Sequence, residues 1–226
     1  MCATRRTGRE VVVATPDSGN RSQLSGRTFT AVDLVATALF GFEGAAAAAQ
    51  TDLDILGILV VGFIVGLGGG ILRDVLLGFL PPASLRSSSR VVAALTGATV
   101  AFVLVGLADA VPATALALCD AAALAFVAIA GAEKAFGMGC SIVVTTVIGG
   151  ISATGGGIIR DVLLGRTPYV LSQSVYGTAA LAGALVVAVT LTYLGRPAVA
   201  LWCGFVATFG LRTLAVLLDW QVPHLT

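Results

Sequence analysis

Seven long stretches of apolar residues, separated by short polar segments, dominate the chain. They cover residues 31–49, 53–67, 91–108, 115–135, 142–154, 175–194 and 198–218. Several reach about 18 residues, which as a helix is enough to cross a hydrocarbon core of ~30 Å. The connections carry helix breakers, including Pro82, Pro112 and Pro168. The pattern therefore predicts an all-α membrane protein with seven transmembrane helices.

The composition supports this prediction and narrows the chemistry. Hydrophobic residues make up 57% of the 226 residues, charged residues 11%, and the mean hydropathy is +0.99. A net charge of +1 with no basic run argues against nucleic acid as a partner. The single histidine, His224, lies outside the apolar stretches, so a histidine metal site or a Ser-His-Asp triad has no histidine there. We therefore expect no enzyme activity, no bound metal and no cofactor.

An internal repeat is the strongest signal in the sequence. Residues 68–78 read GGGILRDVLLG and residues 155–165 read GGGIIRDVLLG, identical at ten of eleven positions. The same offset of 87 residues (155 minus 68) pairs Asp33 with Asp120 without a gap. It also aligns several glycines and a proline. The chain therefore contains a duplication.

Each copy of the repeat holds three apolar stretches. Because three is odd, the second copy enters the membrane from the opposite side, and the two copies form an inverted repeat. We expect a 3+3+1 architecture in which the second and fifth helices are broken by glycines. The predicted units are a flexible polar tail (1–28), a first three-helix repeat (29–110), a second, inverted repeat (113–196), and the seventh helix with a short tail (197–226). Inverted repeats place their permeation site near the bilayer midplane.

Two glycine triplets are the candidate pore lining at that midplane. They are Gly68, Gly69, Gly70, Gly155, Gly156 and Gly157. Each glycine costs about 1 kcal/mol in a helix relative to alanine, so we expect a break or kink at each triplet. Backbone groups freed in this way can line a water-filled path. The alternative is that the glycines permit tight helix crossings, and the two roles can coexist.

Charged residues within or beside the apolar stretches are the candidate pore or gating charges. They are Arg73, Asp74, Arg160, Asp161, Asp33, Asp120, Lys134, Arg212 and Glu43. With Glu133 they comprise four positive and six negative residues, a formal charge of −2 that favours cations. The Arg-Asp pairs could equally pin a helix end, and aspartates near helix starts could be N-caps.

These residues together resemble the prokaryotic TRIC cation-channel family, whose members are also labelled glycine transporters or UPF0126 proteins. The resemblance covers residues 29–223 and rests on the paired GGGxxRDVLLG motifs, Asp33, Asp120, residues 131–135, residues 211–215 and Pro223. It implies a homotrimer in the plasma (inner) membrane of a prokaryote. Each protomer would conduct monovalent cations, chiefly potassium, through its own pore past kinked glycine triplets. Lys134 and Arg212 match charged positions of the family, whereas Glu43 departs from its pattern.

Other functions remain open on the sequence. A secondary transporter for a small amino acid such as glycine fits an inverted repeat and broken helices equally well, and a membrane scaffold is a third possibility. Membrane lipids and monovalent cations are the expected partners. The distribution of arginines places the N-terminus in the cytoplasm by the positive-inside rule, whereas the family resemblance implies the opposite orientation.

Overall fold

The computed structural model describes residues 25–107, 112–172, 174–218 and 220. Most of the predicted N-terminal tail and the end of the predicted C-terminal tail, including His224, lie outside the described residues. The first helix begins at Gly26, so the last three residues of the predicted tail are helical. Ser25 caps this helix by accepting a hydrogen bond from the backbone N–H of Thr28 at 3.3 Å.

Among the described residues, seven helices are long and apolar enough to cross a membrane. They are α1 (Gly26–Ala48), α2 (Ile55–Leu76), α4 (Ser88–Leu107), α5 (Ala113–Gly137), α6 (Ile142–Leu163), α8 (Ser174–Leu194) and α9 (Pro197–Leu217). Two short helices, α3 (Ala83–Arg86) and α7 (Tyr169–Ser172), follow α2 and α6. The prediction of an all-α, seven-helix membrane protein is confirmed. The two short helices were not predicted, because four residues are too few for a periodic pattern.

Of the break or kink expected at each glycine triplet, the break is wrong, whereas the kink stays a prediction. Helix α2 runs unbroken through its triplet to Leu76, and α6 does the same to Leu163. Each helix ends two residues before the last glycine of the repeated motif, and these glycines have positive φ, +79° at Gly78 and +66° at Gly165. This left-handed conformation favours glycine. Backbone N–H groups beyond each of these glycines turn back to carbonyls of the final helical turn, which completes the helix end.

Packing between α2 and α6 explains why the triplets remain helical. A Cβ atom on Gly69 would lie 2.5 Å from the carbonyl oxygen of Ser152, and one on Gly156 would lie 3.2 Å from that of Val65. From Val65 to Gly69 along α2, the contacts on α6 run back from Gly156 to Ser152, so the helices are antiparallel and cross at their triplets. The two contacts are also repeat-equivalent, as an inverted repeat requires. The glycines allow the backbones to approach closely, and this close packing offsets their low helix propensity.

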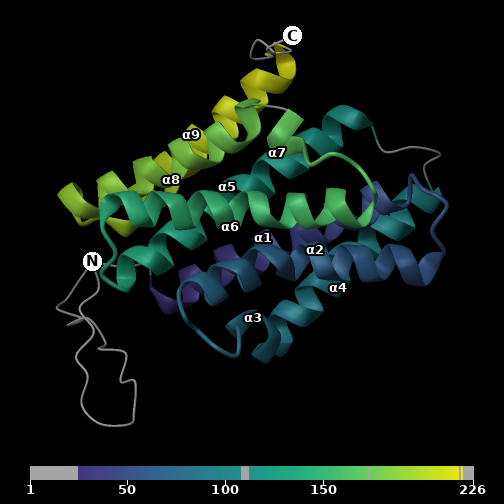
Figure 1. Ribbon diagram of the computed structural model, residues 1–226, viewed down its shortest axis with the longest axis horizontal. Coiled ribbons are helices and arrows are strands. Elements are labelled where there is room, and N and C mark those ends of the chain that lie inside the picture. Colours follow the sequence, from purple (N-terminus) through teal and green to yellow (C-terminus); the bar gives the residue numbers. More distant parts are fainter. Residues whose placement is uncertain (1–24, 108–111, 173, 219, 221–226) are drawn as a thin grey trace.

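Six of the seven long helices form two groups of three around this crossing. Helices α1, α2 and α4 pack together, as do α5, α6 and α8, and α9 packs against α5 and α8 (Figure 1). Helix α1 also contacts α5, so both inner helices of one repeat meet their equivalents in the other. The core between them is rich in alanine, with Phe40, Val65 and Leu124 as larger buried side chains. Small residues at these positions bring the backbones, and the charges they carry, close together.

Candidate functional site

Charged side chains from four helices form a first buried cluster, made of Asp33, Arg73, Asp74, Arg90 and Lys134. Arg73 on α2 donates from Nη1 to Asp33 Oδ1 on α1 at 2.9 Å and from Nε to Asp74 Oδ1 at 2.9 Å. Arg90, at the start of α4, binds the other oxygen of Asp33. Lys134 on α5 donates to Asp74 Oδ1 at 2.6 Å. The first cluster has three positive and two negative groups, a formal charge of +1.

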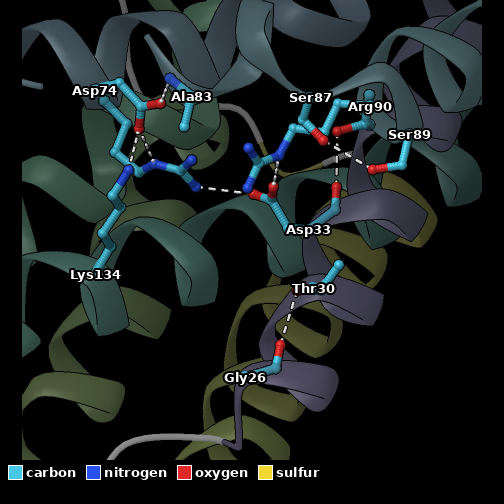
Figure 2. A network of polar contacts seen from close by, with 11 residues as sticks. Gly26, Thr30, Asp33, Asp74, Ala83, Ser87, Ser89, Arg90 and Lys134 are labelled. Carbon is cyan, nitrogen blue, oxygen red and sulfur yellow. Dashed lines mark hydrogen bonds and ion pairs between the residues drawn. The ribbon is translucent and has the colours of Figure 1, made fainter. Parts of the chain in front are cut away.

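Asp74 has both carboxylate oxygens occupied by protein donors. Oδ1 accepts from Arg73 and Lys134, while Oδ2 accepts from the backbone N–H of Ala83 at 2.9 Å. Figure 2 shows Asp74 between Lys134 and Ala83, and Asp33 facing Arg90. Ala83 is the first residue of α3, so Asp74 holds the N-terminus of this short helix against α2. A carboxylate in this place stabilises free helix N–H groups.

A second buried cluster repeats this arrangement with Glu43, Asp120, Arg160, Asp161 and Arg212. Arg160 on α6 donates from Nε to Asp161 Oδ1 at 2.7 Å and pairs through Nη1 with Glu43 Oε1 on α1. Arg212 on α9 lies with its Nε 3.6 Å from Asp120 Oδ2 on α5. Three negative and two positive groups give this second cluster a formal charge of −1.

Backbone and tyrosine donors complete the second cluster. Asp161 Oδ2 accepts from the backbone N–H of Tyr169, the first residue of α7, at 2.7 Å. The Tyr176 hydroxyl, on α8, donates to Asp120 Oδ1 at 3.0 Å. The guanidinium carbon of Arg212 lies 5.0 Å from the centre of the Tyr176 ring, in the range of a cation–π contact. Asp161 therefore holds α7 as Asp74 holds α3.

The two clusters differ where one repeat supplies a residue to the other. Lys134, in the second repeat, reaches Asp74 in the first, but its equivalent in the first repeat is Ala47. Glu43, in the first repeat, reaches Arg160 in the second, but its equivalent in the second repeat is Ala130. The extra residue is thus a cation in the first cluster and an anion in the second. Because Arg90 and Arg212 each add one positive charge to their cluster, Lys134 and Glu43 account for the whole difference in formal charge.

The clusters lie at opposite ends of the helix bundle. The first cluster is formed by the start of α1 and α4 and the end of α2 and α5; the second uses the end of α1, α6 and α9 and the start of α5 and α8. Because consecutive membrane-length helices joined by short connections alternate in direction, the clusters face opposite sides of the membrane. The α2–α6 crossing lies between them.

A cavity opens beside each cluster. The one beside the second cluster has a volume of about 310 Å³ and is lined by residues of α1, α5, α6, α7, α8 and α9, including Glu43, Ala47, Asp120 and Arg212. The one beside the first cluster has a volume of about 410 Å³ and is lined by Arg86, Arg90 and apolar residues of the α2–α4 connection. The protein thus has a cavity lined by charged residues at each end of the bundle.

All nine charged residues predicted as pore or gating charges lie in one or the other of the two clusters. The interpretation of Asp33 and Asp120 as N-caps is wrong, because Asp33 lies inside α1 and Asp120 inside α5, where both bind arginine. Sequence reasoning missed Arg90 and Tyr176. Neither has a charged or hydroxyl-aromatic equivalent in the other repeat, so the repeat pattern gave no signal for them.

Comparison with known proteins identifies the family. The model of a family described as Glycine transporter matches the chain twice, over residues 30–105 and 117–192. The chain belongs to this glycine transporter family. The two matches start 87 residues apart (117 minus 30), which is the offset of the internal repeat.

Members of the glycine transporter family in several bacteria are similar to this chain. The UPF0126 inner membrane protein YadS of Escherichia coli strain K12 is 32% identical over 193 residues, covering 85% of this chain and 93% of YadS. A UPF0126 membrane protein of Deinococcus radiodurans is 37% identical over 155 residues, covering 68% of this chain and 72% of the relative. The seven membrane-length helices and the similarity to these membrane proteins show that the chain is a multi-pass membrane protein.

Solved structures of prokaryotic TRIC channels share the fold. A TRIC cation channel studied for the structural basis of its conductance has a TM-score of 0.79 and 32% identity, covering 88% of this chain and 97% of that one. The TRIC trimeric intracellular cation channel orthologue from Rhodobacter sphaeroides has a TM-score of 0.79 and 31% identity, covering 85% and 99%. The predicted resemblance to prokaryotic TRIC proteins is therefore confirmed.

Proposed function

We propose that the protein is a passive channel for monovalent cations, chiefly potassium, with a conduction path in each protomer. The observation that carries the proposal is the arrangement of two charged cavities at opposite ends of one bundle, separated by the antiparallel crossing of α2 and α6. Relatives of the same fold are TRIC cation channels. As in the trimeric orthologue from Rhodobacter sphaeroides, we propose a homotrimer, here in the inner membrane of a bacterium.

The path runs past the glycine triplets, which are packed against each other. Conduction then requires α2 and α6 to separate at their crossing. Glycine lowers the cost of such a movement, because its backbone has wide conformational freedom and no side chain interlocks across the interface. The triplets act as the gate, and the two Arg-Asp pairs anchor the helix ends on either side of it.

The direct test is electrical. Purified protein is fused into a planar bilayer between unequal concentrations of potassium chloride. Discrete current steps that reverse near the potassium equilibrium potential are expected, and they should persist when chloride is replaced by gluconate. Reversal near the chloride potential, or a silent bilayer with protein shown to be inserted, would contradict the proposal. Bilayers treated with empty detergent micelles are the control.

A specific observation favours one second candidate, a carrier for a small zwitterionic amino acid such as glycine. The cavity beside the second cluster presents three carboxylates, of Glu43, Asp120 and Asp161, and three guanidinium groups, of Arg160, Arg166 and Arg212. A zwitterion needs one group of each sign. Liposomes containing the protein would then take up labelled glycine with saturation and without current steps, whereas a channel would show the reverse.

A further inference from the structure

One carboxylate oxygen in the cavity beside the second cluster lacks a protein partner. Glu43 Oε1 pairs with Arg160, but Glu43 Oε2 is buried and makes no hydrogen bond. The residue is only 6% exposed and forms part of the cavity wall. A buried carboxylate oxygen without a donor is costly, because it has lost its hydration without replacement. It therefore calls for a hydrogen-bond donor or a cation that the described protein groups do not supply.

The other two carboxylates of this cavity have a protein group beside each oxygen, although Arg212 pairs with Asp120 at 3.6 Å without a hydrogen bond. Asp161 uses one oxygen for Arg160 and the other for the backbone N–H of Tyr169. Asp120 uses one oxygen for the Tyr176 hydroxyl and the other for Arg212. Among these three described side chains, Glu43 Oε2 is the carboxylate oxygen that is buried without a protein donor or cation beside it. The missing partner carries a positive charge or donates a hydrogen bond.

The first cluster shows what fills the equivalent space when the protein supplies the cation itself. There Lys134 Nζ lies 2.6 Å from Asp74 Oδ1 and 4.4 Å from the centre of the Phe79 ring. The repeat-equivalent of Lys134 is Ala47, which lines the cavity beside the second cluster one helical turn after Glu43. The repeat-equivalent of Asp74 is Asp161, so a tethered ammonium group in one half corresponds to a cavity lined by Asp161 and Glu43 in the other.

We propose that Glu43 Oε2 binds a monovalent cation in this cavity, in the place that corresponds to the Lys134 ammonium group. The Glu43 carboxylate already pairs with Arg160, so its remaining oxygen suits a single positive charge better than the double charge of calcium. Gln50 and Thr167 line the same cavity, and both carry a neutral side-chain oxygen. A volume of about 310 Å³ leaves room for the water that completes the coordination shell.

A consequence for conduction, which rests on the proposed channel function, is that the two ends of the path are unequal. A bound or passing cation is held beside Glu43 at one end and meets a cluster with a formal charge of +1 at the other. The cavity at the Glu43 end has three carboxylates and three guanidinium groups, so it repels a cation less than the first cluster does. Current should therefore pass more easily in one direction.

Ion binding is tested without any current, by the thermal unfolding of the purified full-length protein in detergent. A ligand that binds only the folded state raises the Tm with its concentration. We expect the wild-type Tm to rise as potassium chloride replaces N-methyl-D-glucamine chloride at constant ionic strength, and Glu43→Gln to lose this rise. Asp52→Asn is the matched control, because Asp52 is an exposed carboxylate in the α1–α2 connection, at the same end of the bundle, and is not part of the cavity wall.

A second pair of variants keeps Glu43 and Arg160 in place. Ala47→Lys puts an ammonium group one turn after Glu43, a spacing that favours a glutamate–lysine pair, and should make the Tm insensitive to potassium. Ala47→Met fills similar volume without charge and should reduce the sensitivity much less. A wild-type Tm that responds equally to the two chloride salts, or a Glu43→Gln protein that keeps the potassium response, would overturn the proposal.

Electrical measurements then separate this inference from the channel proposal. In Glu43→Gln, single-channel current entering from the Glu43 end should fall several-fold at low ionic strength and little at high ionic strength, where salt screens the charge. Asp52→Asn should leave the ratio of currents at opposite voltages nearly unchanged. A potassium-dependent Tm in a protein that carries no current would retain the ion site and reject the channel. Currents with no dependence on Glu43 would retain the channel and reject the role of this residue.

Discussion

Lys134 Nζ lies 2.6 Å from Asp74 Oδ1, although the two residues belong to different copies of the repeat. The contact ties the end of α5 to the end of α2, so it joins the two three-helix groups. Asp74 also binds Arg73 and the N-terminus of α3. Its carboxylate is thus a junction between the repeats as well as an anchor for a short helix.

Removing Lys134 should weaken this junction without destroying it. In Lys134→Met, Asp74 keeps Arg73 and the Ala83 N–H, so we expect a loss of about 2 kcal/mol, in the range of a hydrogen bond to a charged group. A double-mutant cycle with Asp74→Asn measures the pair itself, and neighbours of this kind couple by about 0.5–3 kcal/mol. Additive effects of the two substitutions would show that the contact contributes nothing to stability.

The close packing of α2 and α6 predicts that alanine at the glycines of the crossing destabilises the protein. In Gly69→Ala the new methyl group would meet the Ser152 carbonyl oxygen at 2.5 Å, so the helices must move apart. We expect a loss of about 1–3 kcal/mol, as for an overpacked core. The repeat-equivalent Gly156→Ala meets the Val65 carbonyl at 3.2 Å and should cost less.

A glycine on an open helix face provides the control for this pair. A Cβ on Gly210, in α9, would meet nothing within 4 Å. Gly210→Ala should therefore stabilise the protein by up to about 1 kcal/mol through helix propensity alone. The thermal unfolding of all three variants in detergent checks the order. Equal effects at Gly69 and Gly210 would contradict the packing at the crossing.

The contrast between the glycines shows how far the sequence could predict the fold. Apolar length and the repeated motif are local signals, so the seven helices and the duplication could be predicted from residue order alone. Helix propensity predicted a break at Gly69 because it ignores the partner helix. Contact with Ser152 on α6 decided the outcome, and no pattern within α2 contains that information.

The charged residues of the site were found for the same local reason, but their partners were not. A charge in an apolar stretch is visible in the sequence, and Arg73 and Asp33 were both identified. Their mutual contact spans 40 positions and depends on the angle at which α1 and α2 pack. The cavity beside Glu43 depends on the small side chain of Ala47, and an alanine in an alanine-rich helix carries no signal.

The final glycine of each motif should be replaceable only at the cost of backbone strain. Gly78 and Gly165 have φ of +79° and +66°, and a Cβ on either would meet nothing within 4 Å. Alanine should therefore cost about 1–2 kcal/mol at both positions, from the left-handed conformation alone. Asparagine, which tolerates this conformation better, should cost less. A much larger loss at one site, measured by thermal unfolding, would show that steric contact rather than strain is responsible.

The contribution of the Tyr176 hydroxyl to stability can be measured by removing it alone. It is fully buried, and its hydrogen bond to Asp120 Oδ1 at 3.0 Å leaves the other oxygen of this aspartate with Arg212 at 3.6 Å. In Tyr176→Phe the ring and its contact with Arg212 remain, but one oxygen of a buried carboxylate loses its donor. We expect a loss of about 1.5–3 kcal/mol.

Tyr193→Phe is the matched control, because Tyr193 lies on the same helix and is 75% exposed. Its hydroxyl is not buried, so its removal should change the Tm little. Since Asp120 and Glu43 line the same cavity, Tyr176→Phe also exposes a second carboxylate oxygen to it. If cations bind in this cavity, the lost stability of Tyr176→Phe should be partly restored by potassium and not by N-methyl-D-glucamine. Restoration by neither salt would place the Asp120 carboxylate outside the reach of the ion.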